Sequence, residues 1–154
     1  MPTIRAIKDW TPQVAQHESQ IRALQGRKRP INVLSTNSAW LLSSLVLGCN
    51  GLLSGSGSVI ADLQAKLYRA VKANDLAEAR RLNDRIYPMA RVFYADPFVD
   101  MHNRMKEALV LLGKLPRAVV RPPLVKITDA EIAGIKDALI EAGLLEAALG
   151  RNAA

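Results

Sequence analysis

The sequence predicts an α/β protein in which a short parallel sheet is followed by a helical region. Three apolar stretches, 3–8, 31–35 and 52–54, have the length and composition of strands, and segments with helical periodicity separate them. An order of strand, helix, strand, helix, strand is typical of βαβ units, whose strands pair in parallel. Beyond a loop at 55–58, every apolar pattern repeats at helical spacing, so we expect only helices there.

The elements of the sheet region have recognisable start and stop signals. The strand at 3–8 is followed by a helix that begins near Pro12 and ends near Gly26. The apolar residues of this helix are Val14, Ile21 and Leu24. The second strand follows Pro30, and Ser38 is expected to cap a short apolar helix that runs to Gly48. Asn50 and Gly51 then form the turn into the third strand.

A Gly-Ser-Gly-Ser loop at 55–58 separates the sheet from the helices. One interpretation is an anion site made of backbone N–H groups, because barrels often bind phosphate after their last strands. The other is a tight turn. We favour the turn, because the loop lacks the lysine of a phosphate-binding loop.

The helical region also follows from periodicity and capping. The first predicted helix has an apolar stripe at helical spacing: Ile60, Leu63, Leu67 and Val71. Asp75 is expected to cap the next, in which Pro88 introduces a kink. A third begins at Pro97 and closes at Gly113, and its stripe is Met101, Met105, Leu109 and Leu112. The last opens with a capping box, Thr128 to Glu131, and ends at Gly143.

Length and charge restrict the classes of protein that fit. The chain has 154 residues, of which 49% are hydrophobic, whereas a complete eight-stranded βα barrel needs about 250. The net charge of +7 suits an anionic ligand or simply a basic surface. The basic residues are scattered, and their one dense run, at 27–29, is interpreted as a solvated turn. We therefore expect no nucleic acid partner.

Few residues are available for metal or redox chemistry. Cys49 is the only cysteine, so an internal disulfide, a sulfur zinc site and a redox pair are excluded. His17 and His102 have no partner at ligand spacing, and no metal or cofactor is expected. The longest apolar stretch, 39–49, is interrupted by serines and too short to span a bilayer, and no signal sequence is recognisable. The expected protein is cytoplasmic, without a membrane partner.

Five short motifs occur in a recognisable order: Ala6-Ile7-Lys8-Asp9, Val33-Leu34-Ser35, Gly51-Leu52-Leu53-Ser54, Arg121-Pro122-Pro123-Leu124 and Ala142-Gly143-Leu144-Leu145. Together they resemble the C-terminal part of the dihydrodipicolinate synthase and N-acetylneuraminate lyase family of class I aldolases, from residue 3 to residue 145. The resemblance implies a partial (β/α)8 TIM barrel at 1–95, with the last three strands and their helices. A C-terminal helical region at 96–145 and a flexible tail at 146–154 would follow.

The resemblance implies a catalytic role for Lys8, whose amine would form a Schiff base with pyruvate or another 2-keto acid. Only a neutral amine attacks a carbonyl, and a free lysine with a pKa of about 10.4 is almost wholly protonated at neutral pH. Strand alternation places Ile4, Ala6 and Lys8 on one face. If that face is the barrel interior, Ile4 and Ala6 form an apolar floor that disfavours the ammonium form. Without the resemblance, Lys8 would be interpreted as a surface lysine.

Two more residues fall where the family surrounds the substrate, at the ends of the next two strands. Thr36 stands where the family commonly has glycine, and Leu53 where it has isoleucine or valine. The family's Gly-Asp-Asp is replaced by Thr36-Asn37-Ser38, and Trp10 stands where a small residue is common. These departures favour a sister aldolase or lyase with a differently shaped substrate. Thr36 fits equally well as a cap or loop residue.

Other family elements have no counterpart in the sequence. The family's threonine loop and the tyrosine that relays protons lie on strands that precede the lysine strand. The tyrosines of this chain, Tyr68, Tyr87 and Tyr94, fall on predicted helices and are not assigned that role. The expected partners are a 2-keto acid and either a complementing N-terminal half or further copies of the chain. The alternatives are a noncatalytic interaction or remnant domain and an anion-binding module.

Overall fold

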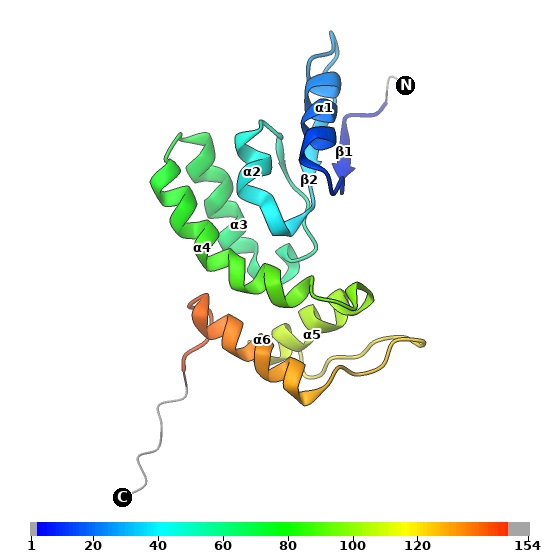
Figure 1. The fold of residues 1–154 in the computed structure, drawn as a ribbon, viewed down its shortest axis with the longest axis vertical. Coiled ribbons are helices and arrows are strands. Elements are labelled where there is room, and N and C mark those ends of the chain that lie inside the picture. The colour runs from blue at the N-terminus through cyan, green and yellow to red at the C-terminus, as the bar shows by residue number, and fades with distance from the viewer. Residues whose placement is uncertain (1–2, 148–154) are drawn as a thin grey trace, which may run out of the picture. The chain divides into compact units, whose positions relative to one another are not determined.

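The computed structural model describes residues 3–147, which belong to two compact units (Figure 1). The amino-terminal unit is Met1–Ile86 and the carboxy-terminal unit is Tyr87–Ala154. The division falls within a helix, α4 (Leu76–Phe93). Most of the expected tail, 148–154, lies outside the described residues.

The amino-terminal unit contains a parallel sheet, as the alternating pattern predicted. Its strands are β1 (Ala6–Asp9), β2 (Asn32–Ser35) and β3 (Gly51–Leu52), in the order β1-β2-β3. In the parallel register Lys8 lies opposite Leu34, and Ser35 lies opposite both Asp9 and Leu52. Among residues 3–147, the outer edges of β1 and β3 pair with no further strand.

The helix after β1, α1 (Val14–Gln25), packs against β2 with a face that the apolar pattern only partly predicts. Its buried residues are His17 and Ile21, one helical turn apart, whereas Val14 is 52% exposed. Val14 precedes Ile21 by two helical turns and lies on nearly the same side of the helix, but it is the first residue of α1 and its side chain remains largely in solvent.

A short helical segment connects β2 with β3. It consists of a 3-10 turn, η1 (Ser38–Trp40), and helix α2 (Leu41–Val46), which also packs on β2. The capping residue is Asn37, whose side chain accepts a hydrogen bond from the Ala39 N–H at 3.2 Å. The prediction that Ser38 caps this helix is wrong, because the Ser38 hydroxyl bonds to Ser54 and Ser56 instead.

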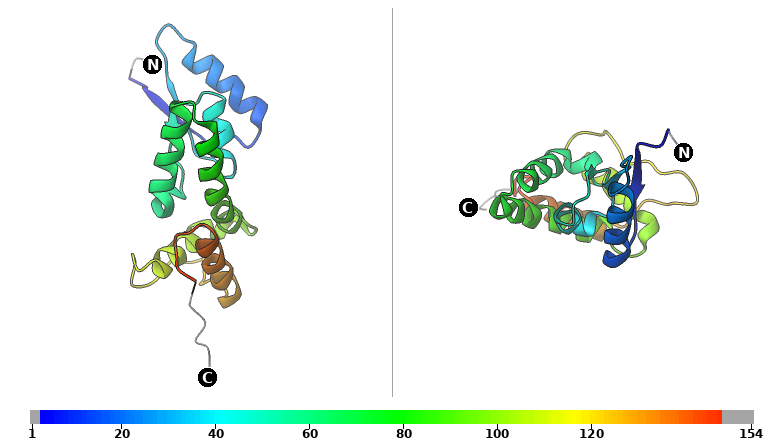
Figure 2. Two further views of the ribbon diagram at one scale, coloured as in Figure 1. Left: turned by 90° about the vertical axis from the view of Figure 1, so that its left-hand side faces the viewer. Right: turned by 90° about the horizontal axis from the view of Figure 1, so that it is seen from above.

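Helix α3 (Gly57–Lys72) and the first half of α4 run side by side in opposite directions (Figure 2). Asp75 caps α4 as predicted, because its Oδ1 accepts a hydrogen bond from the Glu78 N–H at 3.0 Å. Of the predicted stripe on α3, Ile60, Leu63 and Leu67 are buried and Val71 is half-buried. On α4 the apolar Ala79, Leu82 and Ile86 are buried, whereas Leu76 is 47% exposed. Helix α4 includes Pro88 within its length. In α3, one residue, Ile60, has backbone angles outside the helical range.

The carboxy-terminal unit is helical as predicted. A 3-10 turn, η2 (Phe98–Asp100), leads into α5 (Met101–Leu111), which packs against α6 (Asp129–Glu141). Both hydrogen bonds of the capping box at Thr128 and Glu131 are present. Gly113 and Gly143 have φ angles of 68° and 65°, the left-handed conformation that glycine adopts beyond a helix end. No helix within residues 3–147 has the length and hydropathy needed to cross a membrane.

Candidate functional site

The structure brings Lys8, Thr36 and Leu53 together at the carboxyl ends of three neighbouring strands. The register of the sheet and the alternation of side chains place them on the same face. Main-chain hydrogen bonds continue past the strand ends and fix this arrangement. The Thr36 N–H donates to the Asp9 carbonyl at 3.0 Å, and the Leu53 N–H donates to the Ser35 carbonyl at 2.8 Å. We call the face with Lys8 the open face of the sheet.

The open face is in contact with solvent. Lys8 and Ala6 are exposed, Ile4 is 38% exposed and Leu53 is 51% exposed. Within the described residues Ile4 and Ala6 do not remove Lys8 from water, and the prediction that they do so in a barrel interior stays a prediction. Two side chains on one strand form a floor, but desolvation also requires walls, which three strands cannot supply.

Thr36 differs from Lys8 and Leu53 because its side chain is fully buried, at 0% exposure. Its hydroxyl donates a hydrogen bond to the Leu53 carbonyl. Thr36 thus joins the end of β2 to the end of β3, between Lys8 on one side and Leu53 on the other. Because the hydroxyl proton is already engaged, Thr36 has no free hydrogen-bond donor on its side chain.

The Gly/Ser loop forms a tight turn into α3. The Gly57 N–H donates to the Ser54 carbonyl at 3.1 Å, and the Ser58 N–H donates to the Gly55 carbonyl at 3.2 Å. These two N–H groups are thus bonded within the loop. The Ser56 hydroxyl accepts from the Gln64 amide at 2.8 Å. The geometry matches the turn interpretation.

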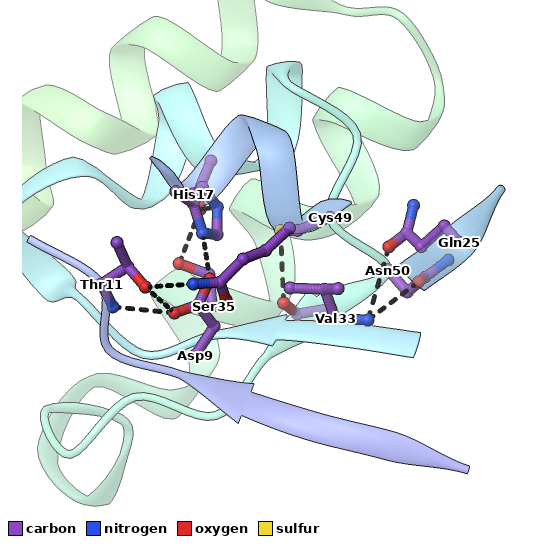
Figure 3. Close-up of polar contacts among 11 residues, drawn as sticks. Asp9, Thr11, His17, Gln25, Val33, Ser35, Cys49 and Asn50 are labelled. Carbon is purple, nitrogen blue, oxygen red and sulfur yellow. Dashed lines mark hydrogen bonds and ion pairs between the residues drawn. The ribbon is translucent and has the colours of Figure 1, made fainter. Parts of the chain in front are cut away.

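The opposite face of the sheet, which α1 and α2 cover, carries a buried ionisable pair (Figure 3). Asp9 Oδ2 lies 2.6 Å from His17 Nδ1, and Asp9 Oδ1 accepts from the Thr11 N–H at 2.8 Å and from the Thr11 hydroxyl at 2.6 Å. Asp9 is 5% exposed and His17 is 1% exposed. Burial raises the pKa of the Asp9 carboxyl, but the hydrogen bonds from Thr11 and His17 outweigh it and hold that pKa below its ordinary value.

A chain of hydrogen bonds continues from this pair to β2. His17 Nε2 is bonded to the Ser44 hydroxyl on α2, and the Ser44 hydroxyl donates to Ser35 Oγ at 2.6 Å. We call Asp9, His17, Ser44 and Ser35 the covered-face chain. It connects the last residue of β1 with the last residue of β2 through two helices.

The sequence patterns do not predict the covered-face chain and give His17 no partner. Two signals for it were present. Strand alternation directs Asp9 away from the Lys8 face, and His17 precedes the buried Ile21 by one helical turn. Ser44 could not be found in this way, because it lies 27 residues from His17 and only the tertiary fold joins them.

A groove is lined by β3 and by residues along most of α3. It has a volume of about 470 Å³, and its lining includes Leu53, Gln64 and Tyr68. Near it, Cys49 is buried and burial raises the pKa of its thiol, which is typical of an unreactive cysteine. Within residues 3–147 no three metal-ligating side chains are grouped closely enough to hold a metal ion.

Comparison with known proteins gives a consistent result over nearly the whole chain. Residues 1–142 match the model of the dihydrodipicolinate synthetase family. The 4-hydroxy-tetrahydrodipicolinate synthase of Erythrobacter litoralis is 32% identical over 145 residues. YagE of Escherichia coli K12, which carries the provisional name 2-dehydro-3-deoxy-D-gluconate aldolase, is 30% identical over 137 residues.

Solved structures agree with the sequence comparison. The crystal structure of YagE in complex with pyruvate superposes with a TM-score of 0.82 at 27% identity, over 92% of this chain and 47% of that one. A monomeric dihydrodipicolinate synthase variant, at 22% identity, supports the fold with a TM-score of 0.83. The chain spans about half the length of the curated relatives it matches: 88% of this chain aligns with 44% of YagE, and 92% with 46% of the Erythrobacter enzyme.

Proposed function

The chain belongs to the dihydrodipicolinate synthetase family, and on that premise we propose that it provides the Schiff-base lysine of an aldolase or lyase acting on pyruvate or a related 2-keto acid. The observation that supports this most strongly is the position of Lys8. It lies at the carboxyl end of a parallel strand, beside Thr36 and Leu53 on one face. Barrel enzymes have their catalytic groups at this end of the strands.

The proposed reaction begins with addition and dehydration. The neutral Lys8 amine attacks C2 of the keto acid, the C2 carbonyl oxygen becomes a hydroxyl, and a water molecule leaves as the C=N bond forms. The protonated imine withdraws electrons from C3, so that a carbon–carbon bond at C3 can form or break. Leu53 would contact the keto acid, and Thr36 would define the wall between Leu53 and Lys8. The provisional name of YagE suggests a sugar-acid aldolase as one sister activity.

We further propose that other strands cover the open face during catalysis. The outer edges of β1 and β3 are unpaired within residues 3–147, and Lys8 is exposed to water. Unpaired strand edges are the places where further strands add to a sheet. The partner we propose is a complementing N-terminal half that carries the remaining strands of the barrel. It would desolvate Lys8 and favour the neutral amine.

The experiment combines complementation with reductive trapping. The chain is purified alone and after coexpression with the segment of YagE that the present chain does not match, and both samples receive pyruvate and borohydride. We expect a faster gain of adduct mass in the coexpressed sample. Lys8→Arg serves as the variant and Lys66→Arg, an exposed lysine on α3, as its control. A coexpressed, folded complex without adduct for any keto acid of a panel would overturn the proposed function.

A noncatalytic interaction domain remains the second candidate, and the exposure of Lys8 favours it. In that case the unpaired edges of β1 and β3 would mediate assembly only. Lys8→Ala would leave the oligomeric state and the complex with the coexpressed segment unchanged, and no keto acid would bind. Association of copies of the chain would appear as a concentration-dependent mass in sedimentation experiments.

A further inference from the structure

The covered-face chain contains an aspartate, a histidine and a serine in series, the residue types of a hydrolase triad. Its burial excludes that role. Ser44 is 0% exposed and His17 is 1% exposed, and neither lines any pocket described above. A nucleophile that no substrate can reach performs no chemistry. Any influence of these side chains on a reaction is therefore exerted through the residues next to them.

Those neighbours are the residues of the proposed site. Asp9 follows Lys8 directly, and Ser35 precedes Thr36 directly. Because successive side chains of a strand point to opposite faces, fixing Asp9 and Ser35 from the covered face fixes Lys8 and Thr36 on the open face. The main chain strengthens the connection, since the Asp9 carbonyl accepts the hydrogen bond from the Thr36 N–H.

Several side-chain hydrogen bonds hold the end of β1 in place. Both carboxylate oxygens of Asp9 are hydrogen-bonded, to Thr11 and to His17, and the Thr11 hydroxyl also accepts from the Gln20 amide at 3.0 Å. The bonds of His17 to Asp9 and of Gln20 to Thr11 tether the end of β1 and the turn after it to α1. At the other end of β2, a separate pair of side chains, Gln25 and Asn50, accepts from the Val33 N–H (Figure 3).

We propose that Asp9, His17 and Ser44 are positioning residues, which set the separation of Lys8 and Thr36 from behind the sheet. The proposal rests on the proposed function, because Lys8 needs precise placement only if it reacts. A displacement of about 1 Å at a reacting group can cost two orders of magnitude in rate. A buried, fully hydrogen-bonded set of side chains restricts such a displacement more than apolar packing does.

The test uses the full chain and two variants that each remove one hydroxyl at nearly constant volume, Ser44→Ala and Ser35→Ala. Ser43→Ala is the matched control, because Ser43 is exposed on the same helix, α2. Hydrogen exchange of the Thr36 and Leu53 amides reports the strand ends, and exchange of the buried Leu67 on α3 reports opening of the whole unit. Trapping of the pyruvate adduct at Lys8 in the coexpressed complex reports the chemistry.

Positioning predicts a local effect. In Ser44→Ala and Ser35→Ala the Thr36 amide should exchange at least about tenfold faster, relative to Leu67, than in the control. The rate of adduct formation should fall by about tenfold while both variants remain folded. Equal acceleration at Thr36 and Leu67, or an adduct rate like that of Ser43→Ala, would overturn the proposal. If the wild type forms no adduct at all, the proposed function fails, and the exchange comparison alone decides whether the covered-face chain positions the strand ends.

Discussion

Lys8 and Asp9 are consecutive residues of β1 whose side chains lie in opposite environments: Lys8 is exposed on the open face, and Asp9 is 5% exposed on the face that the helices cover. The strand therefore separates the proposed chemistry from the polar contacts that support it. A substitution on the covered face should act on stability and on the placement of Lys8, whereas one at Lys8 should act on chemistry alone.

Replacing Asp9 by alanine should destabilise the amino-terminal unit by about 2 kcal/mol, because the Thr11 N–H and the His17 ring lose their acceptor in a buried place. Both tryptophans, Trp10 and Trp40, belong to this unit, so urea unfolding followed by tryptophan fluorescence measures it selectively. Asp62→Ala, at an exposed position of α3, is the control and should change the free energy of unfolding by less than about 0.5 kcal/mol. Equal effects of the two substitutions would contradict the account.

Acid should weaken the same unit through Asp9. Its pKa in the folded state lies below its ordinary value, which is about 3.9 in an unfolded chain. The stabilisation by the ionised carboxylate is therefore complete above that ordinary value and is lost as the pH falls through the lower, folded-state pKa. As the pH is lowered below about 4, the urea concentration at the unfolding midpoint, followed by tryptophan fluorescence, should decrease in the wild type and decrease less steeply in Asp9→Asn. Parallel pH profiles would show that Asp9 does not carry this dependence.

The carboxy-terminal unit should depend on Arg104, whose guanidinium is buried at 2% exposure. It donates to the Ala95, Asp96 and Pro97 carbonyls and to the Glu131 carboxylate. Arg104→Met should cost at least about 2 kcal/mol, because it leaves carbonyl groups without a donor. Calorimetry of the full chain would measure the loss.

Two further variants test the cause of that loss of stability. Arg104→Lys should recover only part of the stability, since an ammonium group cannot reproduce the planar fork of the guanidinium. Arg121→Met, at an exposed position, should be neutral. A fully stable Arg104→Met protein would mean that the buried charge contributes nothing net.

The capping box of α6 should make a smaller contribution to the stability of the carboxy-terminal unit. Thr128 Oγ1 accepts from the Glu131 N–H at 3.2 Å, and Thr128→Ala removes this acceptor. The free energy of unfolding of the carboxy-terminal unit should fall by about 1 kcal/mol, whereas Thr128→Ser should retain most of it. An unchanged calorimetric transition for Thr128→Ala would contradict the assigned cap.

The features that the sequence could predict are those that depend on local order. Three of them are present: the capping box at Thr128, the left-handed conformation of Gly113 at the end of α5, and the alternation that directs Lys8 and Asp9 to opposite faces of β1. Each involves only neighbours in the chain. The parallel sheet followed from the strand and helix order for the same reason.

The remaining features depend on contacts between distant segments. Thr36 is buried with its hydroxyl bonded to the Leu53 carbonyl on the next strand, and the buried His17 is bonded through both ring nitrogens, to Asp9 and Ser44. The exposure of Lys8 depends on which strands cover the open face, and no pattern within one strand contains that information. Val14 shows the same limit, since its apolar side chain is 52% exposed.

The Schiff-base role of Lys8 is tested by a peptide map of the chain, in complex with its complementing segment, after treatment with pyruvate and borohydride. We expect a single reduced adduct on Lys8, which Lys8→Arg abolishes and Lys66→Arg leaves intact. A folded complex that carries no adduct, or one in which exposed lysines such as Lys66 are modified as readily as Lys8, would contradict it.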